Sequence, residues 1–160
     1  MSTTVEARRS PTGDDAFVEE AWVLKEDIRR QFGVLKQQRR FFVSAYRQAS
    51  VILIVDRTDD KLVGFAATRK GGYVLFLAVA PAYQGQGYGR DLIYRAIEDH
   101  GTLTCHARVT NEVALDFYEA LGFEIVRTIS GYYEDGGDAY FLQLGEAASM
   151  RSKIAKFLSR

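Results

Sequence analysis

A glycine-rich turn at residues 83–90 has the residue types and spacing that favour phosphate binding. It reads Tyr83-Gln84-Gly85-Gln86-Gly87-Tyr88-Gly89-Arg90, between an apolar run and a helix-forming one. Glycines let the backbone approach a ligand closely, and free N–H groups at a helix start attract phosphate. The spacing excludes a dinucleotide fingerprint, because Arg90 stands in the third glycine slot, and a P-loop, because no Gly-Lys-Ser/Thr follows. We expect the turn to hold a phosphate-bearing cofactor of another kind; a plain tight turn without ligand is the alternative.

Cys105 and His106 are adjacent in the sequence, and these two residue types could form a catalytic thiolate–imidazole pair. Neighbouring side chains on a strand point to opposite faces, which argues against such a pair. The strand divides into an apolar row, Leu103, Cys105, Ala107 and Val109, and a polar row, Thr104, His106 and Arg108. We therefore expect Cys105 to be a small buried hydrophobe rather than a nucleophile.

The composition is that of one globular domain. Of 160 residues, 47% are hydrophobic and 26% charged, and 21 basic residues balance 21 acidic ones, so no overall field favours nucleic acid. A single cysteine excludes an internal disulfide and makes a cysteine-rich metal site implausible, so we expect no metal. We find no signal peptide, and the longest apolar run, Val74–Ala82, is too short to span a membrane. We expect a soluble, cytoplasmic protein.

Hydrophobic periodicity predicts the elements that must position these residues. The expected strands are Thr3–Arg9, Val51–Arg57, Leu62–Arg69, Tyr73–Val79, Leu103–Val109, Glu124–Tyr133 and Ala139–Leu144. The expected helices are a first one ending near Arg30 and opened by a capping box of Thr12 and Asp15, then Val34–Arg47, Gly87–His100, Asn111–Leu121 and Glu146–Arg160. Strand, helix and strand from Tyr73 to Val109 form a parallel crossover in an otherwise hairpin-built sheet. The predicted fold class is α/β: a mixed, mostly antiparallel sheet with helices on both faces.

Three segments together resemble the GNAT superfamily of acetyltransferases. They are Gln84-x-x-Gly87-x-Gly89 after the strand Phe76–Val79 and Pro81; Asn111-x-x-Ala114-x-x-Phe117-Tyr118-x-x-Leu121-Gly122-Phe123; and Tyr132-Tyr133 followed by Asp138-Ala139. Their order and spacing are similar to those of the protein N-alpha-acetyltransferases, meaning the ribosomal-protein alanine acetyltransferases and the NatE catalytic subunit. The resemblance is close from about Leu62 to Leu144. It implies the GNAT fold, in which the central parallel pair of strands splays apart.

The resemblance implies acetyl-CoA as co-substrate, with its pantetheine arm between the splayed strands. A backbone N–H near Val79 would polarise the thioester carbonyl, as in an oxyanion hole. Asn111 would hydrogen-bond the pantetheine, although Asn is also a favoured helix N-cap. The implied cofactor-binding residues are Leu77, Ala78, Val79, Gln84, Gly85, Gln86, Gly87, Tyr88, Gly89, Arg90, Asn111 and Tyr118.

The same resemblance implies the catalytic and substrate-binding residues. Tyr118 would protonate the departing thiolate, a task that suits a phenol with a pKa of about 10; its alternative is a core aromatic. His106 replaces the glutamate of the bacterial branch, as in the NatE branch, and would act as general base through a water held by Tyr73; its alternative is a packing role beside Tyr73. The implied substrate-binding residues are Phe32, Tyr73, Tyr132 and Tyr133.

The acetyl group is expected to pass directly, without an acyl-enzyme, to a primary amine, and the pKa of the amine favours a protein N-terminus. At pH 7 an α-amine is roughly 14% neutral and a lysine about 0.04% neutral, a disadvantage of about 3.5 kcal/mol for lysine. A site whose evident proton carriers are His and Tyr suits the α-amine better. The alternatives are a GNAT enzyme acting on lysine or a small-molecule amine, and a non-catalytic acyl-CoA-binding module.

Residues 1–145 are expected to form the GNAT domain and residues 146–160 a separate basic amphipathic helix. Met150, Ile154, Phe157 and Leu158 recur at helical spacing among Arg and Lys residues. Such a helix packs on its own domain or on a second copy in a homodimer, or it docks on a partner, an anionic membrane or ribosomal RNA. The sequence leaves these alternatives open.

Overall fold

The computed structural model describes residues 4–145, so the expected helix Glu146–Arg160 lies outside the described residues. The described residues fold into two compact units, one of residues 4–70 together with 74–96, the other of residues 71–73 together with 97–145. The hydrogen-bonded strand order is β1 (Val5–Ser10), β2 (Ser50–Asp56), β3 (Lys61–Arg69), β4 (Tyr73–Val79), β5 (Thr102–Arg108), β7 (Ala139–Gly145) and β6 (Glu124–Ile129). β4 and β5 run parallel, whereas β1–β2, β2–β3, β5–β7 and β6–β7 run antiparallel. The predicted mixed sheet with one central parallel pair is confirmed.

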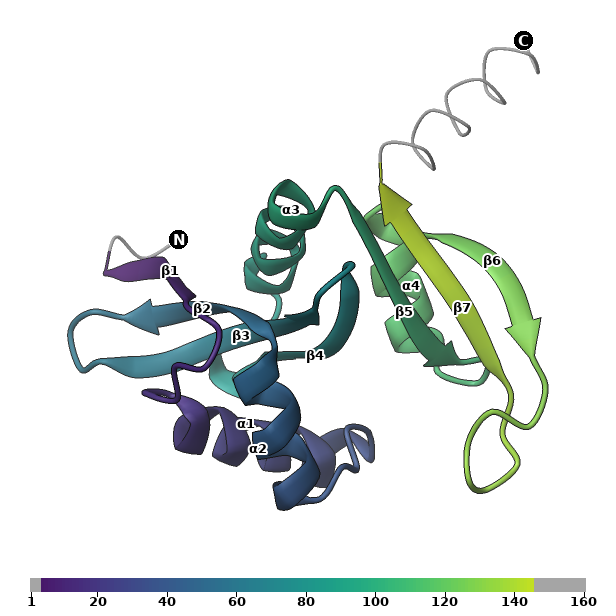
Figure 1. Ribbon diagram of the computed structural model, residues 1–160, viewed down its shortest axis with the longest axis horizontal. Helices are drawn as coiled ribbons and strands as arrows, with labels where there is room; N and C mark the ends of the chain where they lie inside the picture. Colours follow the sequence, from purple (N-terminus) through teal and green to yellow (C-terminus); the bar gives the residue numbers. More distant parts are fainter. Residues whose placement is uncertain (1–3, 146–160) are drawn as a thin grey trace, which may run out of the picture. The chain divides into compact units, whose positions relative to one another are not determined.

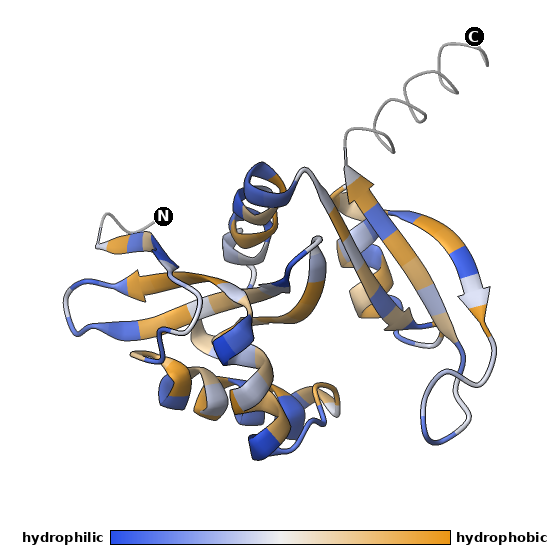
Figure 2. Ribbon diagram, viewed as in Figure 1, coloured by the Kyte–Doolittle hydropathy of each residue, from blue (hydrophilic) through white to orange (hydrophobic). Residues whose placement is uncertain are grey.

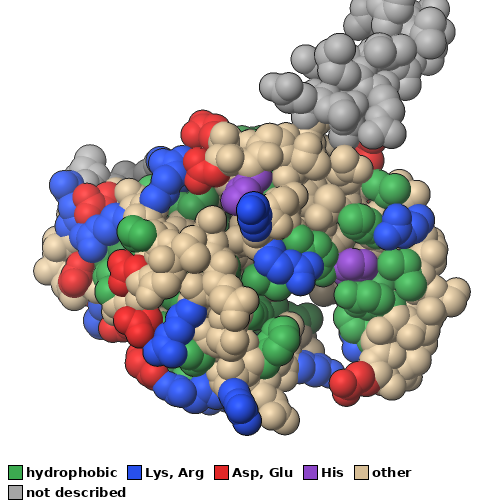
Figure 3. Space-filling model, viewed as in Figure 1, with side chains coloured by type: hydrophobic (Ala, Val, Ile, Leu, Met, Phe, Trp, Pro, Cys, Tyr) green, Lys and Arg blue, Asp and Glu red, His purple; other side chains and the backbone are tan. Residues whose placement is uncertain are grey.

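The first unit is a strand layer between helices on its two faces (Figure 1). Its strands are β1 (Val5–Ser10), β2 (Ser50–Asp56), β3 (Lys61–Arg69) and most of β4 (Tyr73–Val79). Its helices are α1 (Val18–Phe32), α2 (Arg39–Gln48), the 3-10 turn Pro81–Tyr83 and most of α3 (Tyr88–His100). Apolar and polar residues alternate along α1 (Figure 2), as expected of a helix that buries one stripe. Basic and acidic side chains are interspersed over the face of this unit in view in Figure 3.

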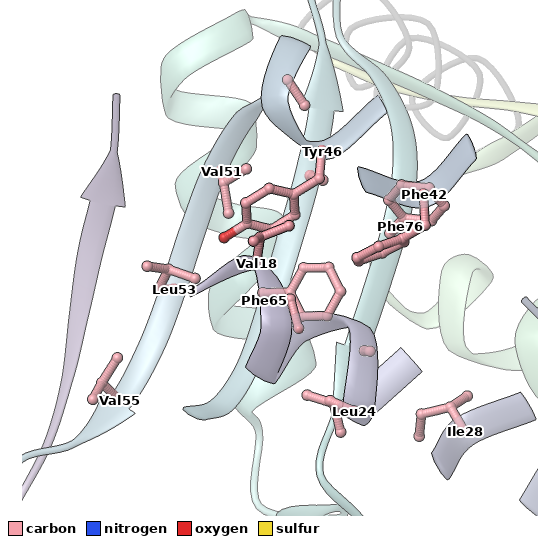
Figure 4. Packing of buried hydrophobic residues seen from close by; sticks show 14 residues of the cluster. Val18, Leu24, Ile28, Phe42, Tyr46, Val51, Leu53, Val55, Phe65 and Phe76 are labelled. Carbon is pink, nitrogen blue, oxygen red and sulfur yellow. The ribbon is translucent and has the colours of Figure 1, made fainter. Parts of the chain in front are cut away.

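An aromatic cluster fixes α1 and α2 on this sheet (Figure 4). Phe42 of α2 is fully buried, and its ring lies 4.7 Å from that of Phe76 on β4 and 6.1 Å from that of Phe65 on β3. Trp22 of α1 and Tyr46 of α2 complete the cluster, with ring centroids 5.6 and 5.9 Å from that of Phe42. Truncating such a central ring to alanine costs about 3–5 kcal/mol, so this cluster sets where β4 enters the glycine-rich turn.

The predicted capping box at the start of α1 is wrong. The N-cap is Phe17, which makes no side-chain capping bond, and the helix begins at Val18. Asp15 instead pairs with Arg47 of α2, and the Asp14 carboxylate accepts the backbone N–H of Ala16. The two carboxylates just before the helix are therefore engaged elsewhere, that of Asp15 in an ion pair with α2 and that of Asp14 in a local turn.

α2 begins five residues later than the expected Val34, because the segment before it is held in a non-helical form. Gly33 and Leu35 adopt positive φ of 69° and 54°. The fully buried Lys25 of α1 donates to the carbonyl of Gln37, pairs with Glu26 at 3.0 Å and lies 4.7 Å from the Trp22 ring centroid. Since a buried ammonium needs such partners, Lys25 fixes the connector that follows Phe32.

The second unit is built on β5 (Thr102–Arg108), β7 (Ala139–Gly145) and β6 (Glu124–Ile129), with α4 (Glu112–Ala120). Tyr73, at the start of β4, belongs to this unit and pairs in parallel with Thr104. The expected alternation on β5 is confirmed, since Leu103, Cys105 and Ala107 are buried and the polar row is half-buried.

β6 ends at Ile129, so the expected strand Glu124–Tyr133 is four residues too long and Tyr132 and Tyr133 lie in a loop. The loop folds on itself: Tyr133 donates its N–H to the Gly137 carbonyl at 3.1 Å, and Gly136 donates to the Tyr133 carbonyl at 2.9 Å. These local bonds replace the ladder bonds that a longer strand would make.

Among residues 4–145 no helix is long and apolar enough to cross a membrane. The same residues contain no cluster of three His, Cys, Asp or Glu side chains that could hold a metal ion.

Candidate active site

The glycine-rich turn of the first unit presents unpaired backbone donors at the start of α3. Gly85 and Gly87 adopt φ of 79° and 90°, a conformation that side chains disfavour. The Asp91 N–H donates to the Gly87 carbonyl at 3.0 Å, so the N–H groups before it have no intrahelical acceptor. A Cβ built on either glycine would meet nothing within 4 Å, so this backbone is uncovered. The residues fit a pyrophosphate, whose oxygens need such donors.

β4, the strand that precedes the turn, has mainly its backbone available for contact with a cofactor. Ala78 is buried in the core beneath α1 and α2, whereas Leu77 and Val79 are half-buried and point to the other face. The Gln84 side-chain amide donates to the Val79 carbonyl at 3.0 Å, which ties the turn to the end of β4. The Ala80 N–H is taken by the Val63 carbonyl at 2.8 Å.

His106 of the second unit lies among aromatic side chains from three segments. The Tyr73 hydroxyl is 2.7 Å from the imidazole Nδ1. The Tyr132 ring stacks on the imidazole, with centroids 4.3 Å apart and planes 13° from parallel. Phe141, the β7 residue in register with His106, packs at 5.1 Å. Tyr73, His106 and Tyr132 were all expected in the site, and the structure brings them together.

This surrounding lowers the pKa of His106 below its ordinary value, chiefly through burial and secondarily through the positive charge of Arg127. The direction keeps the imidazole neutral at pH 7, as a general base must be. Because Nδ1 faces Tyr73, Nε2 is the nitrogen left to take a proton when Nδ1 carries the ring hydrogen.

The loop that carries Tyr132 is clamped to β5 by Arg108, two residues from His106. The Arg108 guanidinium lies 4.0 Å from the Tyr133 ring centroid and 3.1 Å from the Asp135 carboxylate. A Cβ at Gly137 would come within 2.5 Å of the Arg108 guanidinium, so a side chain there would require the guanidinium to shift. The loop base is closed by Asp138, which accepts the Gly131 N–H at 2.9 Å.

Tyr118 and Asn111 lie on and before α4. The Asn111 side chain accepts the Ala114 N–H at 3.1 Å, so its N-cap role is confirmed, whereas its contact with pantetheine remains a prediction. Burial, followed by the nearby Cys105 thiol, raises the pKa of Tyr118, so its phenol stays protonated. Burial raises the pKa of the Cys105 thiol to about 12, which fits an inert hydrophobe.

Phe32, the last residue of α1, belongs to the first unit and is half exposed. Its substrate contact remains a prediction. Sequence reasoning missed Phe141, Arg127 and the Arg108–Asp135 clamp. The polar row on β5 could have indicated Arg108, but the other two depend on the register between strands.

The Acetyltransferase (GNAT) family profile matches residues 17–123, which is most of the chain and ends before β6. An uncharacterized protein of Mycobacterium leprae (strain TN) is 35% identical over 97 residues, which are 54% of this chain and only 27% of that protein. An N-alpha-acetyltransferase of Sulfurisphaera tokodaii is 27% identical over 123 residues, 64% of this chain and 74% of that enzyme.

Among solved structures, the ribosomal-protein-S18-alanine N-acetyltransferase from Escherichia coli superposes with a TM-score of 0.69. The superposition covers 87% of this chain and 93% of that one, at 24% sequence identity. At this identity the match shows a shared fold.

Proposed function

Since this chain belongs to the acetyltransferase (GNAT) family, we propose that it transfers acetyl from acetyl-CoA to the α-amine of a protein N-terminus. The observation that carries the proposal is His106, a neutral imidazole hydrogen-bonded to Tyr73 and covered by Tyr132. Relatives named N-alpha-acetyltransferase support the choice of a protein N-terminus.

The first unit would hold acetyl-CoA. The N–H groups of residues 85–90 would bind the pyrophosphate, and the backbone around Leu77, Ala78 and Val79 would lie along the pantetheine arm. A backbone N–H near Val79 would stabilise the oxyanion as the thioester carbon becomes tetrahedral.

The second unit would move the protons. The amine nitrogen attacks the thioester carbon, a C–N bond forms, and the C–S bond breaks as the tetrahedral intermediate collapses. His106 Nε2 takes the proton from the amine nitrogen, directly or through one water, while Tyr73 holds Nδ1. Tyr118 would give its proton to the departing sulfur; burial raises its pKa, which keeps the phenol protonated at neutral pH and also makes it a weaker acid than an exposed tyrosine. Tyr132, Tyr133 and Phe32 would line the path of the peptide.

Thiol release with acetyl-CoA tests the proposal across peptides with free N-termini, N-terminally blocked peptides with an internal lysine, and small amines. We expect turnover on free N-termini that exceeds turnover on blocked lysine peptides at least about 10-fold at pH 7. Faster turnover on lysine peptides or small amines would show that the acceptor is a lysine side chain or a small amine instead of an N-terminus. Tight binding of acetyl-CoA with no turnover on any amine would indicate an acyl-CoA-binding module.

We further propose that the reaction takes place in the cytoplasm, where acetyl-CoA and nascent N-termini are both present. A second copy or another partner, docking through residues 146–160, remains part of this proposal. Size measurement of the full chain with and without these residues checks it.

A further inference from the structure

We propose that Arg127 selects substrates with an acidic side chain within the first three residues of the acetylated N-terminus. This inference rests on the proposed function, because it assumes that the amine arrives at His106. It adds a preference among N-termini that the family match, which ends at residue 123, does not address.

A cross-strand row places Arg127 beside the imidazole. His106 on β5 is in register with Phe141 on β7, and Phe141 is in register with Arg127 on β6. The three side chains therefore share one face of the sheet. The Arg127 guanidinium carbon lies 4.5 Å from the Phe141 ring centroid, and that centroid lies 5.1 Å from the imidazole. At this separation the positive charge of Arg127 contributes, after burial, to the lowered pKa of His106.

An irregularity in β6 is what brings Arg127 to this face. The register shifts between Ile125 and Arg127, so Ile125 opposes Leu142, Arg127 opposes Phe141, and Val126 is the extra residue. Without the shift Val126 would oppose Phe141, and Arg127 would share the face of Leu142, which is fully buried. Bulges commonly re-aim a side chain beside an active site. Here the bulge turns a charged group toward the imidazole; in Figure 1, β6 curves along β7.

The charge of Arg127 is available to a ligand. Among the described residues it makes no ion pair, and its contact is the face of the Phe141 ring. Arg108, the cation on the polar row of β5, forms an ion pair with Asp135. Asp138, in the loop that follows β6, accepts the Gly131 N–H with its carboxylate.

The reach of a peptide matches this geometry. The two separations along the row put the Arg127 guanidinium within about 10 Å of the imidazole. An extended chain advances about 3.3–3.6 Å per residue, so a carboxylate on one of the first three residues can reach the guanidinium while the amine is at His106. Arg binds carboxylates well, because its planar fork can donate two parallel hydrogen bonds.

The test compares peptides that differ only in carrying Glu, Gln or Lys, placed in turn at positions 1, 2 and 3. For the wild type we expect kcat/KM to be about 5-fold higher for Glu than for Gln at the favoured position, and lower again for Lys, because the pair is partly exposed. Arg127→Gln should remove the Glu preference, and Arg127→Glu should reverse the order so that Lys is preferred. Lys61→Glu makes the same change of net charge in the first unit, at the start of β3, and should keep the wild-type order.

The outcomes separate the two proposals. Turnover on free N-termini with equal kcat/KM for Glu, Gln and Lys would overturn the Arg127 inference and leave the proposed function standing. A Glu preference that survives Arg127→Glu would show that another group causes it, and would also overturn the inference. No turnover on any of these peptides would refute the proposed function, and the inference with it.

Discussion

At His106 an imidazole exchanges part of its hydration for contact with aromatic rings, and its proton affinity falls as a result. Burial is the main cause of its lowered pKa, and the Arg127 charge is the second. The same contacts fix the ring, since Tyr73 holds Nδ1 and Tyr132 covers one face. A histidine that combines a hydrogen bond to a phenol with a lowered pKa is a candidate catalytic residue, so His106 is the residue at which to test catalysis.

His106→Gln should lower turnover by about 10²-fold, the low end for loss of a general base. Gln keeps the size and polarity of the side chain but cannot take a proton. Acetyl-CoA affinity, measured by calorimetry, should change little, because His106 is not among the residues proposed to contact the cofactor and the proposed pyrophosphate contacts, residues 85–90, lie in the other unit. If the variant keeps more than half of the wild-type kcat at pH 6–8, His106 is not the general base and has a packing role only.

The pH dependence of kcat should show an acid limb with an apparent pKa below 6.5. His106 acts as base only when neutral, so kcat rises with pH through its lowered pKa and then levels off. Arg127→Gln removes a positive charge that disfavours the imidazolium, so it should move the limb to higher pH. A limb that stays in place in this variant would contradict the electrostatic part of the argument, and one that persists in His106→Gln would belong to another group.

At the scale of elements, the turn between β4 and α3 and the loop between β6 and β7 carry the proposed contacts, each for a different reason. The turn works through its backbone, because positive φ at Gly85 and Gly87 leaves the donors of α3 uncovered. The loop works through side chains, because Arg108 and Asp138 hold its shape while it carries Tyr132 over His106.

Gly87→Val should abolish acetyl-CoA binding and leave the protein folded. A side chain at a φ of 90° is strained, and its Cβ would stand where the phosphate approaches. Gly13→Val is the matched control: Gly13 has a φ of 91°, and its Cβ would also meet nothing within 4 Å. It should carry a similar conformational cost, of about 1 kcal/mol or more, without loss of affinity. If Gly87→Val binds acetyl-CoA with wild-type affinity in calorimetry, the turn does not hold the cofactor.

Arg108→Lys should raise the peptide KM by about 10-fold and lower kcat by less. Lysine keeps the charge but loses the planar group that lies on Tyr133 and pairs with Asp135, so the loop loses its clamp. Arg95→Lys, in the surface pair with Asp91 on α3, is the control and should leave both parameters unchanged. Unchanged KM in Arg108→Lys would mean that the loop keeps its position without the clamp.

At the scale of the molecule, the proposed tasks are divided between the two units. The residues proposed to hold acetyl-CoA through the pyrophosphate belong to the first unit, and those proposed to move protons belong to the second. We therefore expect single substitutions in one unit to affect cofactor binding and single substitutions in the other to affect proton transfer.

Acetyl-CoA at about 100 times its Kd should stabilise the protein by about 2.7 kcal/mol and raise Tm by about 5–10 °C. His106→Gln should show the full rise in thermal denaturation, because its substitution leaves the cofactor contacts intact. Gly87→Val should show none. A loss of the rise in His106→Gln would indicate that the imidazole takes part in cofactor binding.

The sequence by itself determined the features that depend on local backbone geometry. The glycine spacing of residues 83–90, the apolar and polar rows of β5 and the N-cap at Asn111 each follow from rules that act over a few residues, and each is present in the structure. The mixed sheet followed from the order of the predicted elements.

Only the tertiary structure decided which side chains meet across strands. The bulge at Val126 shifts a register that no local pattern records, and it alone puts Arg127 on the face of His106. The late start of α2 depends on a contact between segments, the bond from Lys25 to the Gln37 carbonyl, and the loop that ends β6 early is held to β5 by the Arg108–Asp135 pair in addition to its own local bonds. Sequence periodicity shows which face a residue prefers within its own element. The pairing of distant segments, which sets the environment and hence the proton affinity of His106, is fixed by the packing of the whole unit.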